Sequence, residues 1–208
     1  MFHRNRPTPL ASVDLSLWAH SVNDSALSKV AGWTNTTLTA LNLDNSTMWT
    51  SKRGGGLQLL LASCPNLMQF SASRSPSVDA AAVGALSECG LRRLRLSECE
   101  FSPVALQQLR VCSTLQVLDV QGCPNITYTD VNIVLANCAK LESIHLSGMQ
   151  HPRTLKQRRA LSEGIVSSKT VKDVMLSGLE GLDGHFFDSW VSKSPQMRSL
   201  DLSRCVVL

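Results

Sequence analysis

The chain has 208 residues, of which 43% are hydrophobic and 17% are charged, so it can bury a core and is not expected to be disordered. Its 20 lysines and arginines against 16 acidic residues give a net charge of +4, which is too small and too scattered to indicate a nucleic-acid partner. No apolar run reaches the roughly 20 residues of a membrane-spanning helix. Residues 1–12 lack the apolar region of a secretory signal, whereas a mitochondrial presequence stays open because Asp14 is the first acidic residue.

A short apolar pattern recurs along the chain. In segment 112–138 the letters LQVLDVQGC place apolar residues at positions 115, 118 and 120 and a cysteine at 123, a spacing that resembles the leucine-rich-repeat template L-x-x-L-x-L-x-x-N/C. The same spacing begins at eight positions: Leu10, Leu38, Leu67, Leu91, Leu115, Leu141, Val171 and Met197. Successive starts lie between 24 residues apart (67 to 91) and 30 residues apart (141 to 171), in or next to the range of about 20–29 for such repeats. We therefore predict that residues 1–208 form a single leucine-rich-repeat domain of about eight repeats.

Segments with helical spacing lie between these predicted strands. In chain order, their apolar faces are Val22/Leu27/Val30, Leu57/Leu60/Leu61, Val78/Ala82/Leu86, Leu106/Leu109, Val131/Val134/Leu135, Leu161/Ile165 and Phe187/Trp190/Val191. Ser102 and Pro103 supply a cap residue and a first-turn proline for the fourth of them. Alternating strands and helices predict an α/β solenoid, or horseshoe, with a parallel sheet on its concave side and helices on its convex side.

The seven cysteines follow the same register. Four of them lie two or three residues before a strand start: Cys64, Cys89, Cys112 and Cys138. The other three lie eight residues after a strand start: Cys99, Cys123 and Cys205. Because no C-x-x-C or zinc-type cysteine–histidine spacing occurs, we expect buried structural thiols, with no metal and no cofactor. Such thiols indicate a reducing, intracellular compartment, with the cytoplasm as the expected location and the mitochondrion and nucleus left open.

The chain resembles the cysteine-containing subfamily of leucine-rich repeats. The repeat at 112–138 matches this subfamily most closely, through Cys112, Cys123, Pro124, Ile126, Thr127, Asp130 and Cys138. The subfamily is typical of F-box/LRR substrate receptors of ubiquitin ligases and of related adaptors and scaffolds, so the resemblance implies protein binding. The first repeat begins by Leu10, which leaves no room before it for the helical F-box module.

Motifs for catalysis are absent from the sequence. The histidines at positions 3, 20, 145, 151 and 185 share no motif, and no G-x-S-x-G, P-loop or H-E-x-x-H pattern occurs. Gly54-Gly55-Gly56 follows Lys52-Arg53 but lacks the G-K-[ST] ending of a phosphate loop, which favours a flexible turn before a helix. The basic cluster Arg153, Lys156, Arg158 and Arg159 fits a solvated helix face, with an acidic lipid or nucleic acid as the alternative. We expect neither an enzyme nor a small-molecule substrate.

The side chains between the strand leucines are expected to face the hollow of the horseshoe, because strand side chains alternate between faces. Arg93 and Arg95, with Arg74 one repeat earlier, form a predicted positive patch, and Asp119, Asp173 and Asp201 make the C-terminal half acidic. The predicted protein-binding residues are Arg74, Arg93, Arg95, Asp119, His145, Asp173, Met175 and Asp201. The alternative is an ordinary solvated face that binds nothing.

Two functions are compatible with these features. The first is a non-catalytic adaptor that binds a protein partner on its concave face within a larger complex, for example as the substrate-recognition part of a ubiquitin ligase. The second is a structural subunit or assembly factor embedded in a cytoskeletal, mitochondrial or ribosomal complex. The second is favoured by an apolar C-terminal tail, Val206-Val207-Leu208, that directly follows a strand without a closing helix.

Overall fold

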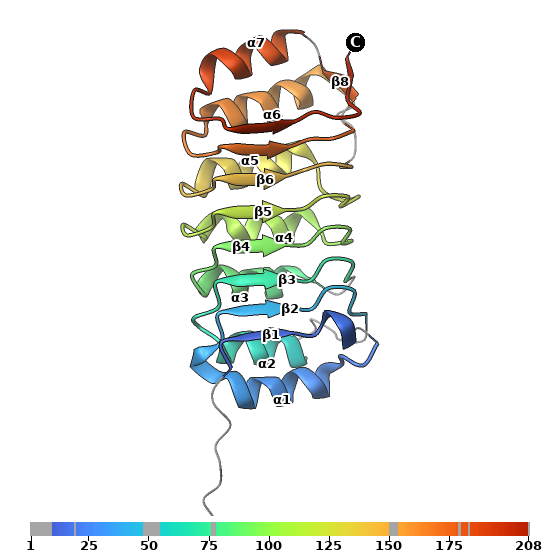
Figure 1. Ribbon diagram of the computed structural model, residues 1–208, viewed down its shortest axis with the longest axis vertical. Helices are drawn as coiled ribbons and strands as arrows, with labels where there is room; N and C mark the ends of the chain where they lie inside the picture. The colour runs from blue at the N-terminus through green and yellow to red at the C-terminus, as the bar shows by residue number, and fades with distance from the viewer. Residues whose placement is uncertain are drawn as a thin grey trace, which may run out of the picture.

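The computed structural model describes residues 10–18, 20–47, 55–75, 78–149, 154–178, 180–182 and 184–207. Its main element is a parallel sheet of eight strands in the order β1-β2-β3-β4-β5-β6-β7-β9. The helices stack behind this sheet on one side, so that each repeat contributes one strand and one helical segment (Figure 1). The predicted α/β leucine-rich-repeat solenoid is confirmed.

Each of the eight strands is three residues long and carries the second apolar residue of the predicted pattern at its centre. The strands are β1 Ser12–Asp14, β2 Ala40–Asn42, β3 Gln69–Ser71, β4 Arg93–Arg95, β5 Val117–Asp119, β6 Ser143–His145, β7 Asp173–Met175 and β9 Ser199–Asp201. Neighbouring strands pair centre to centre, as Leu94 does with Leu118. The leucine spacing therefore predicts both the strands and their register.

The helical segments vary more than the strands. They are α1 Asp24–Thr34, α2 Gly56–Ser63, α3 Ala80–Glu88, α4 Pro103–Gln107, α5 Tyr128–Asn137, α6 Leu155–Ser167 and α7 Gly184–Lys193, with 3-10 turns η1 Ser16–Trp18, η2 Asn35–Thr37 and η3 Gln108–Val111. The segment predicted to start at Pro103 does start there, but it changes to a 3-10 turn after five residues. A small second sheet pairs β8 (Glu180–Leu182) with β10 (Val206–Val207), and the repeat pattern did not predict it.

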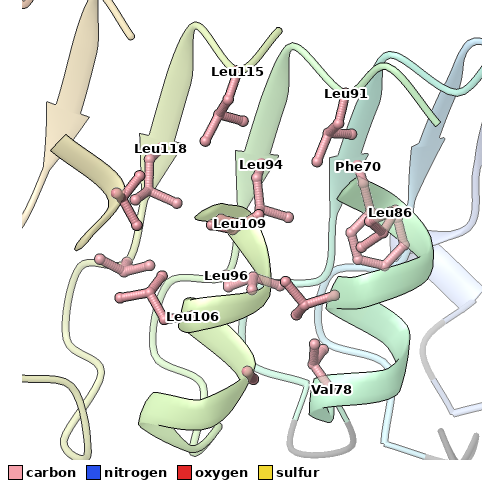
Figure 2. Close-up of a cluster of buried hydrophobic side chains, with 14 of the residues drawn as sticks. Phe70, Val78, Leu86, Leu91, Leu94, Leu96, Leu106, Leu109, Leu115 and Leu118 are labelled. Carbon is pink, nitrogen blue, oxygen red and sulfur yellow. The ribbon is translucent and has the colours of Figure 1, made fainter. Parts of the chain in front are cut away.

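The core lies between the sheet and the helices. In the central repeats Leu91, Leu94 and Leu96 are completely buried, and Figure 2 shows them beside leucines from the adjacent helices. Burying a side chain of this size stabilises the fold by about 1.5–3 kcal/mol. In α7 the buried aromatic pair is Phe186 and Trp190, with ring centroids 4.2 Å apart. The predicted face of this helix named Phe187 instead, whose side chain lies outside the described residues.

A left-handed residue follows the strand in seven of the described repeats and extends the backbone ladder. These residues have φ between 57° and 80° and are Asn45, Arg74, Glu98, Gly122, Gly148, Gly178 and Arg204. The first six of them donate their backbone N–H to a carbonyl of the next coil. Glu98, for example, bonds to the carbonyl of Gln121 at 2.7 Å. The turn therefore adds a hydrogen bond beyond each of the strands β2 to β7.

In four repeats a side-chain donor closes the same turn, three residues after the third core residue. The thiols of Cys99, Cys123 and Cys205 donate to backbone carbonyls of the preceding coil at 3.1, 3.0 and 3.3 Å. In an earlier repeat the hydroxyl of Ser75 makes the equivalent bond, to Leu43 at 3.1 Å. These residues occupy the N/C position of the repeat template, so the cysteines there join one coil to the previous one.

The first two helices approach each other closely at a glycine. The backbone N–H of Gly56 donates to the Asp24 side chain at 3.0 Å, and an added Cβ at Gly56 would lie 2.2 Å from the Asp24 carbonyl oxygen. The atoms that an added Cβ would meet belong to the backbone of Asp24, the first residue of α1. They cannot move aside without moving the start of that helix. The α1–α2 joint therefore requires a residue without a side chain at position 56.

We predict that Gly56→Ala lowers the free energy of unfolding by about 1–3 kcal/mol, because the new methyl group overpacks the joint. The matched control is Gly84→Ala in α3, where the nearest atom to an added Cβ is the Gln108 side chain at 3.8 Å. Removing the flexibility of a helical glycine there is expected to stabilise the protein by about 0.4–1 kcal/mol. Urea denaturation of both variants measures the difference; equal changes would show that the close approach is unimportant.

Candidate protein-binding face

The outward side of the eight-stranded sheet, called the sheet face below, carries two columns of side chains. The first column is Ser12, Ala40, Gln69, Arg93, Val117, Ser143, Asp173 and Ser199, and the second is Asp14, Asn42, Ser71, Arg95, Asp119, His145, Met175 and Asp201. Since the residue between each pair points into the core, these side chains point away from the helices. Seven of the eight predicted binding residues lie on this face, and Arg74 does not belong to either column.

Arg74 occupies the left-handed turn after β3. Its guanidinium makes two parallel hydrogen bonds to the carboxylate of Glu98, with Nε–Oε2 and Nη2–Oε1 distances of 3.1 Å. Glu98 is the equivalent turn residue of the next repeat. The Arg74 side chain is thus paired within the chain, next to the sheet face rather than on it.

Several polar side chains of the second column have a local role that the sequence reasoning missed. They accept a hydrogen bond from the backbone N–H two residues later, which ends the strand in an Asx turn. The pairs are Asp14–Ser16 at 2.9 Å, Asn42–Asp44 at 3.0 Å, Asp119–Gln121 at 3.1 Å and Asp201–Ser203 at 2.8 Å. The recurring letters D-L-S at 14–16 and 201–203 carry this signal in the sequence.

These turns also fix the charge of the carboxylates. Hydrogen bonds from the Ser16 hydroxyl and backbone hold the pKa of Asp14 below its usual value. The pKa of Asp201 is lowered in the same way, chiefly by the Ser203 backbone N–H. Both groups are therefore anions at neutral pH whose lone pairs are already partly used.

Asp119 and His145 form a pair across β5 and β6. The Asp119 carboxylate lies 3.6 Å from His145 Nδ1, and the other imidazole nitrogen lies 3.2 Å from the Ser143 hydroxyl. Burial opposes the ionisation of Asp119, but hydrogen bonds from His145, the Ser97 hydroxyl and the Gln121 backbone outweigh it and lower the pKa. The pair is a connected cluster at the centre of the C-terminal half of the sheet face.

Arg93 and Arg95 differ from the other charged residues of the sheet face. Both side chains are exposed, and neither forms an ion pair or side-chain hydrogen bond with the part of the chain that the structure describes. They line a hollow of about 210 Å³ over β1–β4, together with Asn42, Gln69 and Ser71 among others. Two unpaired guanidinium groups therefore point into a shallow polar depression.

The acidic groups in this hollow are bound to the chain itself. Besides Asp14, it is lined by Asp44, whose carboxylate accepts hydrogen bonds from the Ser71 hydroxyl at 2.6 Å and the Ser73 backbone N–H at 2.7 Å. Among the charged groups in the hollow, the arginines are thus the ones whose hydrogen-bonding capacity is left for another molecule. On β7, Asp173 and Met175 are half-buried and lie beside the Lys172–Glu142 ion pair, whose atoms are 2.9 Å apart.

The phosphate-loop and basic-cluster alternatives fall mostly outside the described residues. Within them no group of three or more His, Cys, Asp or Glu side chains could hold a metal ion, and no helix is long and apolar enough to cross a membrane. Lys52, Arg53 and Gly54 lie outside the described residues, as do Arg153 and the side chains of Lys156 and Arg158. Arg159 is exposed on α6.

Burial raises the thiol pKa of six cysteines, which therefore stay protonated at neutral pH: Cys64, Cys89, Cys99, Cys112, Cys123 and Cys138. All seven are free, and six are buried while Cys205 is half-exposed. Burial raises the pKa of Cys123 and of Cys138 to about 12. Because the thiolate is the form that attacks electrophiles and binds metals, these groups are suited to packing and not to catalysis.

We predict that Ellman's reagent, added to dilute folded protein at pH 8, reacts rapidly with about one thiol per chain, that of Cys205. The other six thiols should react only as fast as the protein opens, and all seven should react in urea. Cys205→Ser should remove the rapid phase. If several thiols of that variant reacted rapidly, the burial of the other six cysteines would be contradicted.

Comparison with known proteins supports the fold. No family model and no curated protein sequence matches the chain. Among solved structures it is similar to an internalin (InlF) from Listeria monocytogenes, with a TM-score of 0.61 and 16% identity over 91% of this chain and 54% of that chain. It is also similar to TLR13 in a TLR13–ssRNA13 complex, with a TM-score of 0.57 and 18% identity over 89% of this chain and 27% of that chain. The chain spans about half and about a quarter of the lengths of these two leucine-rich-repeat proteins, and the likeness identifies its fold as a leucine-rich-repeat solenoid.

Proposed function

We propose that this chain is a non-catalytic interaction module that binds an acidic segment of a protein partner on its sheet face, with Arg93 and Arg95 as the anchors. The observation that carries the proposal is that these two guanidinium groups are exposed and unpaired within the described residues, whereas the other charged groups in the same hollow are bound internally. An acidic segment would supply the carboxylates with which these two guanidinium groups can pair.

The geometry of β4 suits such a segment. Residues two apart on a strand point to the same side and lie roughly 6.5–7 Å apart, so the two side chains can bind two different carboxylates. Arginine binds carboxylates through paired, parallel hydrogen bonds and is common among the residues that dominate binding energy at protein interfaces. The side-chain amide of Gln69, which lines the same hollow, can bind the backbone of the segment.

The remaining predicted residues extend this surface toward the C-terminal end. Asp173 and Met175 lie three strands beyond β4 in the same sheet, and between them lies the Asp119–His145 cluster. A partner that crosses the strands would meet a positive region first and a negative one afterwards. This order of charge would determine which end of the partner segment lies over β4 and which lies over β7.

An adaptor role follows from this surface, and the substrate-recognition part of a ubiquitin ligase is one assembly in which such a module would serve. In either case we propose that the chain acts as one domain. The alternative is a structural subunit embedded in a large complex, for which the exposed side chains of Trp18 and Trp33, 66% and 59% exposed, would supply a contact surface.

The test of the proposed function is the double charge reversal Arg93→Glu/Arg95→Glu. Fluorescence anisotropy with a labelled peptide rich in Asp and Glu should show binding to the unmodified protein and a loss of at least tenfold in affinity for the variant. The matched control is Arg110→Glu/Arg159→Glu, which makes the same charge change at two exposed positions in the helical segments and should bind like the unmodified protein.

Two further probes separate the alternatives. A lysine-rich peptide of equal length should bind at least tenfold more weakly than the acidic one. Single-stranded RNA of similar length tests whether the arginines bind phosphates instead. Tighter binding of RNA than of the acidic peptide, or an equal loss of affinity in the control variant, would overturn the proposal.

A further inference from the structure

Two arginines of this chain each have a carboxylate at the equivalent position of the next coil. Arg74 and Glu98 occupy the left-handed turns that follow β3 and β4. Arg95 and Asp119 occupy the second column of the sheet face on β4 and β5, where they are register partners. Neighbouring strands of a sheet lie about 4.8 Å apart, so the arginine of either pair can reach the acid beside it.

The two pairs are arranged differently. The Arg74 guanidinium makes two hydrogen bonds of 3.1 Å to the Glu98 carboxylate, which has no other hydrogen-bond donor among the described residues. Arg95, in contrast, forms no ion pair with Asp119 or with any other residue that the structure describes. Opposite charges side by side on neighbouring strands attract each other, so other contacts must hold the Asp119 carboxylate.

The Asp119 carboxylate is bound by three donors. One of its oxygens accepts the Gln121 backbone N–H at 3.1 Å, the other lies 3.6 Å from Nδ1 of His145, and the Ser97 hydroxyl donates as well. Of these, His145 lies on β6, which flanks β5 on the side away from β4 (Figure 1). The imidazole therefore draws the carboxylate away from Arg95.

The imidazole of His145 is itself held in place. Its other ring nitrogen lies 3.2 Å from the Ser143 hydroxyl on the same strand, and its register partner on β7 is the uncharged Met175. The side chain is 22% exposed, so its neighbours restrict the rotamers that it can adopt. The ring is thus fixed with Nδ1 toward the Asp119 carboxylate.

We propose that His145 is a positioning residue that keeps the Asp119 carboxylate off Arg95 and so leaves this guanidinium open to an acidic partner. The consequence for binding rests on the proposed function, whereas the position of the carboxylate does not. Without the imidazole, that carboxylate can turn and pair with Arg95, in the way that Glu98 pairs with Arg74. An incoming carboxylate would then have to displace an internal one.

The test compares two replacements of His145. Phenylalanine keeps a ring but has no donor, whereas asparagine keeps an N–H close to the position of Nδ1 and already occurs in the second column, as Asn42 of β2. His145→Phe should lower the affinity for the acidic peptide by about three- to fivefold, which corresponds to the strength of an exposed ion pair. His145→Asn should bind like the unmodified protein, and circular dichroism checks that both variants are folded.

The decisive comparison repeats His145→Phe in an Asp119→Asn background, which lacks the competing charge. Asparagine can keep the turn, since Asn42 at the equivalent position accepts the backbone N–H of Asp44 at 3.0 Å. In this background His145→Phe should leave the affinity unchanged, because no carboxylate remains to pair with Arg95. An equal loss of affinity in both backgrounds would mean that His145 contacts the peptide or only supports the fold, and it would overturn the proposal.

A second measurement does not depend on the peptide. Phenylglyoxal modifies arginine side chains, and mass spectrometry can follow Arg95 with Arg93 of the same strand as the internal reference. Modification of Arg95 should slow several-fold in His145→Phe and recover when Asp119→Asn is added, and an unchanged rate would overturn the positioning role. If the acidic peptide fails to bind the unmodified protein, the proposed function is wrong, and the modification rate of Arg95 still decides the role of His145.

Discussion

The whole structure depends on the joint between one coil and the next, because a strand of three residues cannot hold its coil in place by itself. From β2 to β9 each joint combines the short parallel ladder, a hydrogen bond from the left-handed turn residue and, in several repeats, a bond from a buried thiol or hydroxyl. In the inner repeats the strand leucines, such as Leu94 and Leu118, are completely buried between the neighbouring coils and the helices. Stability in such a chain is approximately the sum of its coils and its joints.

The same constraint divides the polar residues of the sheet face into two groups. Where the strand must turn sharply into the next segment, an aspartate or asparagine can bind the turn, as Asp119 and Asp201 do. Acidic residues in this column are therefore explained largely by chain geometry. Arginine cannot accept a hydrogen bond from a backbone N–H, so Arg95 cannot have that role at the same position. Its presence there needs another explanation, and binding of an external acid is the one that its chemistry favours.

The sequence predicts the repeating part of this structure well because the pattern of each repeat lies within a few consecutive residues. The leucine spacing is sufficient to locate all eight strands of the main sheet and their register, and the position of the cysteines relative to the strands anticipates their place at the joints. Features that depend on contacts between coils are harder to predict. The Arg74–Glu98 pair joins residues 24 positions apart through two left-handed turns, and neither residue type is typical of that conformation. The β8–β10 sheet, outside the repeat pattern, is missed for the same reason.

A repeat structure also shows where function can be specific. Positions that recur in every coil are occupied by residues that the coil itself requires, so a site for a particular partner has to come from departures from the repeat. Among the eight strands of the sheet, β4 is the one with a charged residue in both outward columns, and both of its charges have the same sign. This departure leaves the joints between coils intact, since β3 and β5 pair with β4 in the common register. A site for a particular partner at β4 is therefore compatible with the repeat that builds the solenoid.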